Sequence, residues 1–403
     1  MLLVHLSDIH LGRRQYGLEA RARDYEEAFM RAVGKVIELK ESKGVEAVLV
    51  TGDIFDNPRP APSTYLTAIR GFTMLKNAGL RILAIRGNHD ASATNPVDNP
   101  IQVLSSSGLL EYLDGGFVDL GGVRVIGVGC VPRDRQERAV KAVRGLMGRG
   151  LNIVMMHQYI EGTPYKYPMP NIDYYSISQA DLPKTPHYAL GHIHEHALAH
   201  PTLSAVYAGS LEIWDSGEFE TYVIDSGRLT RVKGQDPKGF LILEADESKG
   251  RVKVTPVQLE AGRRMIRLIV NVSGEDPRHF REAASEASQL NIGGSYIQVD
   301  VVGKLAEGFS TRDYDFTRFF KSIFSNALGV NVRIDVTKPT SAASRINVRG
   351  LGEMLEVALG KAIGDRAILN ALIAAVDLID QGREDEAEAL LMKVIRNGGV
   401  DKP

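Results

Sequence analysis

The chain has 403 residues, of which 44% are hydrophobic and 24% charged, values typical of a globular protein long enough for more than one domain. Its formal net charge of -2 excludes a globally basic nucleic-acid or membrane binder, so such a role would need a local basic patch. The single cysteine, Cys130, excludes an intrachain disulfide and favours a reducing compartment. The first residues lack a signal-peptide pattern and no apolar run could span a bilayer. We therefore expect an intracellular protein, in the cytoplasm and nucleoid if prokaryotic, with no membrane role.

Apolar strands alternate with amphipathic helices in the first 90 residues. We expect strands at residues 2–6, 45–50 and 80–85, because each is a short apolar run that ends in turn residues. Apolar residues recur at helical spacing over 24–40, and a second helix is expected over 63–77. Ser63 would cap that second helix and Gly79 would close it. This alternation predicts an α/β fold with parallel strands.

The next part of the chain contains more strands than helices. One helix is expected, at residues 133–147. Strands are expected at residues 117–120, 123–128, 151–156, 188–190, 205–207, 220–224 and 240–243. So many later strands predict two packed sheets, that is, a two-layer β-sandwich flanked by helices.

The pattern changes near residues 234–238, which predicts a domain boundary that leaves 1–235 as the core. Residues 236–336 alternate strands and helices and predict a small α+β domain. Residues 337–350 have the composition of a linker. Residues 351–403 are expected to be helical, and they are apolar enough that they must bind a partner or pack on one another.

Histidine, aspartate and asparagine residues follow five of the predicted strands directly. The set comprises Asp8, His10, Asp53, Asn88, His157, His192 and His194. Such positions meet at one edge of an α/β sheet, and His192 and His194 point to the same side of an extended segment. Imidazole with carboxylate and amide suits Mn²⁺, Fe or Zn²⁺ better than Mg²⁺ or Ca²⁺. Seven ligands are too many for one ion and suit two ions that share a bridging aspartate, which can hold a hydroxide and clamp a phosphoryl group.

The order of these motifs resembles that of the calcineurin-type metallophosphoesterases, over about residues 1–235. The motifs are Asp8-X-His10, Gly52-Asp53-X-X-Asp56, Gly87-Asn88-His89-Asp90, His157 and Gly191-His192-X-His194. A narrower resemblance lies in residues 6–12 and in the following Gln15-Tyr16. These are similar to the nuclease subunit of SbcCD-type double-strand-break repair complexes and its archaeal and eukaryotic counterparts.

The resemblance implies a role for each motif residue. Asp8, His10 and His194 would hold one Mn²⁺, and Asn88, His157 and His192 the other, with Asp53 bridging and Mg²⁺, Fe or Zn²⁺ as other possible metals. His89 would stand over the scissile phosphate and assist proton transfer to the leaving oxygen. Asp56 departs from the pattern, because many archaeal and eukaryotic members have a histidine there that assists catalysis. Asp56 and Asp90 are candidates to lie behind the ligands and orient them or His89.

The resemblance also implies a function and partners. The chain would be a Mn²⁺-dependent 3′-to-5′ exonuclease on duplex DNA and an endonuclease on single strands. It would form a homodimer through residues 63–77 and the segment after Pro100. Its C-terminal helices would bind a coiled-coil ABC-type ATPase.

Two basic clusters are the candidates for DNA contact. Arg13, Arg14, Arg21 and Arg23 flank the first motif together with Tyr16, and Arg133, Arg135 and Arg138 form the second cluster. Two alternative functions are compatible with the same predicted metal ligands. One is a phosphatase or small-molecule phosphodiesterase, and the other is a protein that mainly tethers DNA ends.

Overall fold

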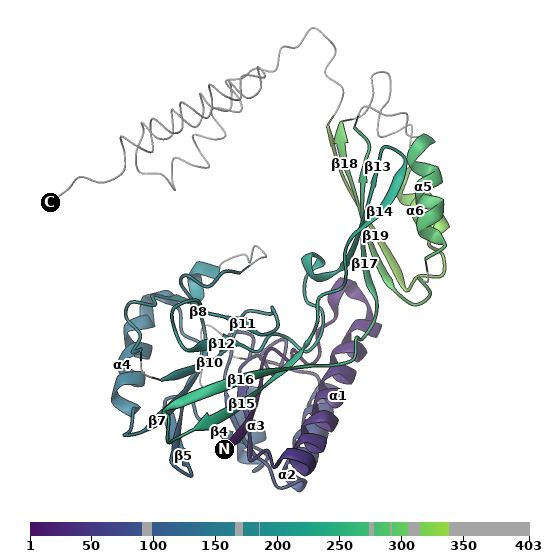
Figure 1. The fold of residues 1–403 in the computed structure, drawn as a ribbon. Helices are drawn as coiled ribbons and strands as arrows, with labels where there is room; N and C mark the ends of the chain where they lie inside the picture. The colour runs from purple at the N-terminus through teal and green to yellow at the C-terminus, as the bar shows by residue number, and fades with distance from the viewer. Residues whose placement is uncertain are drawn as a thin grey trace, which may run out of the picture. The chain divides into compact units, whose positions relative to one another are not determined.

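The computed structural model describes residues 1–90, 99–165, 172–184, 186–273, 278–290, 292–304 and 315–337. Residues 1–303 and 314–336 form one compact unit, and its described residues are drawn in colour in Figure 1. The helices expected within 351–403 and most of the expected linker lie outside the described residues. Among the described helices, none is long and apolar enough to cross a membrane.

The first sheet has the strand order β16-β15-β1-β2-β3-β4. Its strands are β1 (Leu2–Leu6), β2 (Ala47–Thr51), β3 (Arg81–Ile85), β4 (Glu111–Tyr112), β15 (Gly239–Asp246) and β16 (Arg251–Gln258). The strands β1 to β4 run parallel, whereas β15 pairs antiparallel with β1 and β16. The crossover helices are α1 (Glu19–Lys43) and α2 (Pro62–Asn77), and α3 (Pro100–Ser106) precedes β4. The predicted β-α-β-α-β run with parallel strands is confirmed.

The second sheet has the strand order β11-β12-β10-β7-β6-β5. Its strands are β5 (Gly116–Leu120), β6 (Val123–Val128), β7 (Leu151–His157), β10 (His187–Gly191), β11 (Leu198–Ala199) and β12 (Ala205–Tyr207). The central strands β6, β7, β10 and β12 are parallel, and α4 (Gln136–Leu146) connects β6 to β7. The short strands β8 (Tyr159–Ile160) and β9 (Ser176–Ile177) pair separately.

Alternation along the strands builds the layers. In β2, Leu49 faces a core formed with residues of the second sheet, such as Ile153, whereas Val48 faces the core beneath α1 and α2. A third cluster lies between α4 and the second sheet. Since successive side chains of a strand point to opposite faces, two buried faces give the nearly unbroken apolar runs seen in the sequence. The predicted two-layer sandwich flanked by helices is confirmed.

A third sheet has the order β14-β13-β17-β18-β19, and α5 and α6 lie along one of its faces (Figure 1). Its elements are β13 (Glu220–Asp225), β14 (Arg228–Lys233), β17 (Met265–Asn271), β18 (Tyr296–Lys304), β19 (Gly329–Thr337), α5 (Arg278–Ser288) and α6 (Phe316–Ile323). The expected boundary near residue 235 does not separate the sheets. The strands β13 and β14, which precede it, belong to the third sheet, whereas β15 and β16, which follow it, belong to the first. A division of the chain into domains must therefore assign β13 and β14 to the third sheet and β15 and β16 to the first.

The start of α2 differs from the prediction. The helix begins at Pro62, its N-cap is Ala61, and no side chain caps it, so the expected capping role of Ser63 is wrong. Proline suits the first helical position because its missing N–H would have no partner there. Gly79 follows the helix with φ +76°, a conformation that favours glycine.

Candidate metal centre

The carboxyl ends of strands in both sheets meet at one edge of the sandwich. Asp8 and His10 follow β1, and Asp53 and Asn88 follow β2 and β3. The remaining histidines come from the second sheet: His157 is the last residue of β7, and His192 and His194 follow β10. The backbone N–H of His192 donates to both carboxylate oxygens of Asp8, at 3.1 and 3.2 Å, which joins the two sheets at the site.

The backbone is bent where it delivers these side chains. Asp8, His10, Asp53 and His192 have φ values of 50°, 49°, 50° and 92°. Positive φ is uncommon outside glycine, and its clustering is typical of functional sites where surrounding structure holds it in place. Gly87 is required nearby, because a Cβ there would collide with the Asp53 carboxylate.

The first ligand set brings together Asp8, His10 and His194. Nε2 of His10 lies 3.3 Å from Nε2 of His194 and 3.9 Å from Oδ1 of Asp8. Nε2 of His194 lies 3.5 Å from the same Asp8 oxygen. All three side chains are buried, and their ligand atoms point to one position.

The second ligand set brings together Asn88, His157 and His192. Oδ1 of Asn88 lies 3.0 Å from Nε2 of His157 and 3.0 Å from Nδ1 of His192. Nδ1 of His157 bonds to the Thr51 carbonyl at 2.8 Å, which leaves Nε2 as the ligand atom.

Asp53 lies between the two sets. Its Oδ2 is 3.3 Å from Nε2 of His157 and 3.6 Å from Nε2 of His10. Burial alone would raise the pKa of Asp53, but the imidazoles of His157 and His89 outweigh burial and hold it well below its usual range. An ionised carboxylate that faces both sets has the geometry of a bridging ligand.

The residues present fit divalent cations. Buried carboxylates converge with imidazoles, and such a group needs compensating positive charge. Burial opposes a charge on His157, yet the carboxylates of Asp53 and Asp8 raise its pKa to about 9, so the site draws positive charge inward. The mixed nitrogen and oxygen donors suit Mn²⁺, Fe or Zn²⁺.

His89 stands at the open side of this centre. Its backbone N–H donates to Oδ1 of Asp53 at 2.8 Å, and its Nδ1 bonds to the Asp56 carbonyl at 2.9 Å. The side chain is 32% exposed, whereas the aspartate and histidine ligands are buried. Asp90 lies behind it, buried, and accepts from the backbone N–H groups of Gly87 and Phe55. Asp90 therefore orders the loops that carry Asp53 and His89.

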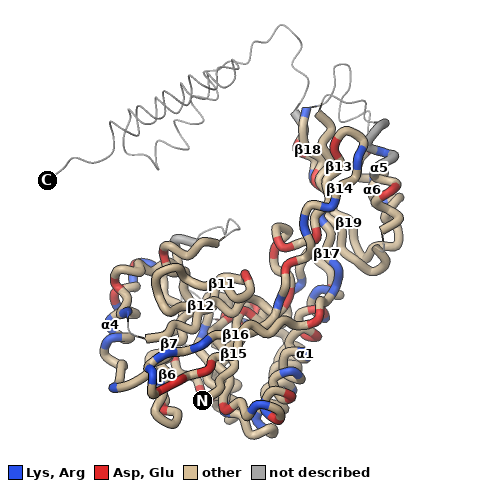
Figure 2. Tube along the Cα trace, in the orientation of Figure 1, with Lys and Arg blue, Asp and Glu red and all other residues tan. Residues whose placement is uncertain are grey.

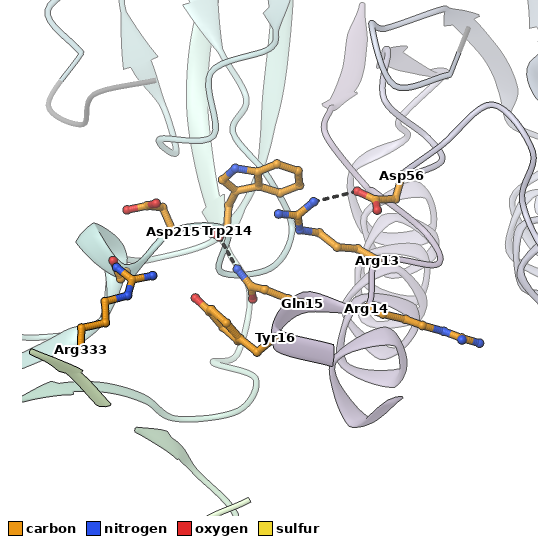
Figure 3. A pocket seen from close by; sticks show the side chains of 9 residues that line it. Arg13, Arg14, Gln15, Tyr16, Asp56, Trp214, Asp215 and Arg333 are labelled. Atoms are coloured by element: carbon orange, nitrogen blue, oxygen red, sulfur yellow. Dashed lines mark hydrogen bonds and ion pairs between the residues drawn. The ribbon is translucent and has the colours of Figure 1, made fainter. Parts of the chain in front are cut away.

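Trp214 completes the site, and no motif in the sequence predicts it. Its indole ring centroid lies 4.2 Å from those of both His10 and His194. The Arg13 guanidinium stacks on the indole at 3.3 Å and bonds to Asp56 at 3.0 Å. Figure 3 shows Arg13 between Trp214 and Asp56.

The other candidates for DNA contact lie apart from the ligands. Arg14 points away from Trp214 (Figure 3) and pairs with Glu19 at 3.2 Å. Tyr16 stacks on Tyr296 of the third sheet with ring centroids 4.0 Å apart. Arg21 is fully buried and pairs with Asp24, so the expectation that it contacts DNA is wrong.

The expected second basic cluster is spread over the start of α4. Arg133 pairs with Glu161 at 3.0 Å. In the described residues, Arg133, Arg135 and Arg138 do not join the metal centre.

Comparison with known proteins agrees with this geometry. Residues 1–196 match the family described as calcineurin-like phosphoesterase. Residues 1–196 therefore resemble a calcineurin-like phosphoesterase domain, and the site is that of a metal-dependent phosphodiesterase.

Several proteins named Mre11 are similar to this chain. The chain is 27% identical over 295 residues to the DNA double-strand break repair protein Mre11 of Methanocaldococcus jannaschii, covering 71% of this chain and 73% of that protein. The protein of the same name from Thermoplasma acidophilum is 27% identical, covering 80% and 82%. The one from Sulfurisphaera tokodaii is 30% identical, covering 55% and 56%. The chain thus spans little more than half the length of the Sulfurisphaera relative.

Proposed function

We propose that this chain is a DNA nuclease that acts in double-strand break repair. The observation that carries the proposal is the pair of ligand sets that share Asp53, with His89 exposed beside them. The relatives are named as double-strand break repair proteins. Repair of chromosomal DNA takes place inside the cell, so the proposed function requires an intracellular location.

The residues of the site would form two cation-binding sets. Asp8, His10 and His194 would hold one divalent cation, and Asn88, His157 and His192 a second, with Asp53 shared. Two such cations supply a strong nucleophile from water and positive charge opposite the phosphoryl oxygens. We propose Mn²⁺ for both, because the donor set is mixed.

His89 would supply the proton for the leaving oxygen. Its Nδ1 faces the Asp56 carbonyl, and this bond fixes the ring so that Nε2 faces the open side. An imidazole in that position can donate a proton to the departing oxygen of a phosphodiester. Asp56 and Asp90 would act by holding the loop that carries His89.

The proposed substrates are duplex ends, degraded 3′ to 5′, and single strands, cut internally. Figure 2 shows basic and acidic residues interspersed along the described chain, so DNA contact depends on local groups. Arg13 and Tyr16 line a hollow beside Trp214, which supports the proposal that they contact DNA, and Arg14 lies further out on the surface.

We also propose a homodimer and an ATPase partner. Leu66 and Ile69 of α2 and Val103 of α3 are exposed apolar residues, and an exposed apolar patch marks an interaction surface. The helices proposed to bind a coiled-coil ABC-type ATPase lie outside the described residues.

Purified protein should degrade linear duplex DNA with Mn²⁺ and lose that activity with chelator. The comparison substrate is 4-nitrophenyl phosphate, a phosphomonoester. Faster hydrolysis of the monoester while DNA stays intact would contradict the proposal and favour a phosphatase.

A further inference from the structure

A hollow of about 420 Å³ opens next to the first ligand set. Its lining includes Arg13, Tyr16, Trp214, Asp215 and Arg333, so it draws on the first motif loop, on the segment after β12 and on β19 of the third sheet. Trp214 forms the wall shared with the metal centre, since its indole packs on the rings of His10 and His194. A ligand in this hollow would therefore lie next to one at the metal centre, with the Trp214 indole between them.

Arg13 is held in place before any ligand binds. Its Cζ lies over the indole of Trp214, 3.3 Å from the ring centroid, and its Nη1 donates to Asp56 at 3.0 Å. Its buried Nε has no hydrogen-bond partner among the described residues. A guanidinium fixed in this way loses little entropy when it binds a phosphate, and its planar fork suits phosphate oxygens.

The Trp214 wall is also rigid. The backbone N–H of Trp214 donates to the Glu218 carboxylate at 2.8 Å, and the Gln15 side chain donates to the Trp214 carbonyl. Arg21, buried in α1, donates to the neighbouring Ile213 carbonyl at 2.9 Å. The surface on which Arg13 stacks therefore does not depend on a mobile loop.

The charges in the hollow favour an anion. Asp56 is paired with Arg13, and Asp215 accepts from the Gly217 N–H at 2.7 Å. Arg333 is exposed and makes no ion pair with the described residues. The three arginines that line the hollow, Arg13, Arg14 and Arg333, exceed its two aspartates, Asp56 and Asp215, by one positive charge. This excess lies beside the proposed phosphoryl-binding centre, at a position that a second phosphate of the same strand could occupy.

We propose that this hollow is a subsite for the backbone phosphate next to the scissile one, contacted by Arg13 and Arg333. The inference rests on the proposed nuclease function. It explains why the enzyme would prefer polynucleotides to substrates with a single phosphate. A phosphomonoester or an isolated phosphodiester has no second phosphate and leaves the subsite unused. A strand of two or more phosphodiesters fills it.

The test is the gain in kcat/KM from one additional phosphate. Thymidine dinucleotide, with one phosphodiester, and thymidine trinucleotide, with two, are hydrolysed with Mn²⁺ by the full chain. The unmodified protein should prefer the trinucleotide. In Arg13→Ala the trinucleotide-to-dinucleotide ratio of kcat/KM should fall about tenfold or more, as expected for loss of a hydrogen bond to a charged group, and Arg13→Lys should restore part of it. Arg333→Ala should lower the ratio too, and it keeps the test valid if Arg13→Ala does not fold.

The matched control is Arg81→Ala. Arg81 begins β3, at the opposite end of the strand from the site, and forms an exposed pair with Glu111. A loss that is equal on both substrates in Arg13→Ala would indicate a structural role and overturn the subsite, as would an unchanged ratio. If the unmodified protein hydrolyses 4-nitrophenyl phosphate but no nucleotide substrate, the nuclease proposal fails as well.

Discussion

Nε2 of His10 lies 3.3 Å from Nε2 of His194, although 184 residues separate them. Each histidine follows a strand of a different sheet. Two imidazole nitrogens at this distance can share one proton or one cation. The convergence of the Asp8 carboxylate on the same position favours the cation.

The first prediction concerns metal content. His194→Ala and His192→Ala should each reduce bound Mn²⁺ by roughly one ion per chain, because each histidine belongs to a different one of two metal sites. Metal analysis after dialysis measures this. His196→Ala is the control, since His196 lies two residues further and bonds to the Ala208 carbonyl. Loss of both metals in either variant would contradict the division into two sets.

The second prediction concerns His89. His89→Ala should retain both metals and lower kcat on DNA about 10²–10⁴-fold, the usual contribution of a general acid. Metal analysis and single-turnover cleavage are measured on the same preparation. Undiminished cleavage would remove His89 from the chemistry, whereas retained DNA tethering without cleavage would separate the two activities.

The ligand positions could be predicted from the sequence because each follows an apolar strand directly. Each strand determines where the residue after it lies, and the fold brings the carboxyl ends of parallel strands to one edge of the sheet. Trp214 could not be predicted in this way. It lies in an irregular segment, and its position depends on buried contacts such as the one from Arg21 to Ile213, which are 192 residues apart.

The sheet to which each strand belongs could not be predicted from the sequence either. The strands β13 and β15 were both expected from their apolar residues, but an apolar pattern does not encode the pairing partner. The N–H of Ala245 in β15 bonds to the Met1 carbonyl, so this strand pairs with the start of the chain. Such long-range pairing is decided by the whole fold and not by local sequence.

The third prediction concerns assembly. Leu66 is 67% exposed on α2, and Leu66→Glu should convert the proposed dimer into monomers because a buried charge in the interface would lack a partner. Light scattering during gel filtration measures the mass. Val232→Glu on β14, at a position 57% exposed, is the control. A dimer that persists in Leu66→Glu would place the interface elsewhere.

The fourth prediction concerns the buried ion pair behind His194. Nζ of Lys238 lies 2.8 Å from the Glu218 carboxylate and bonds to the His194 carbonyl at 2.9 Å. Lys238→Met leaves that carboxylate buried and unpaired, so unfolding in urea should show a loss of about 3–5 kcal/mol. The double variant Lys238→Met with Glu218→Gln should recover part of this loss. A double variant less stable than the single one would show that the charge pair is not the cause.

The fifth prediction concerns acid stability and His187. Burial lowers the pKa of His187 from 6.5 to about 4, so as pH falls the unfolded chain takes up this proton first. The stability contributed by the neutral imidazole is complete above pH 6.5 and decreases as pH falls towards 4, by about 3 kcal/mol in all. His187→Asn keeps a polar atom near the Ser204 hydroxyl, which Nδ1 of His187 contacts at 3.0 Å, and cannot titrate. Urea unfolding of both chelator-treated proteins at several pH values should show the difference in unfolding free energy shifting in favour of the variant between pH 6.5 and 4. A difference that stays constant over this range would mean that folding does not change the pKa of His187.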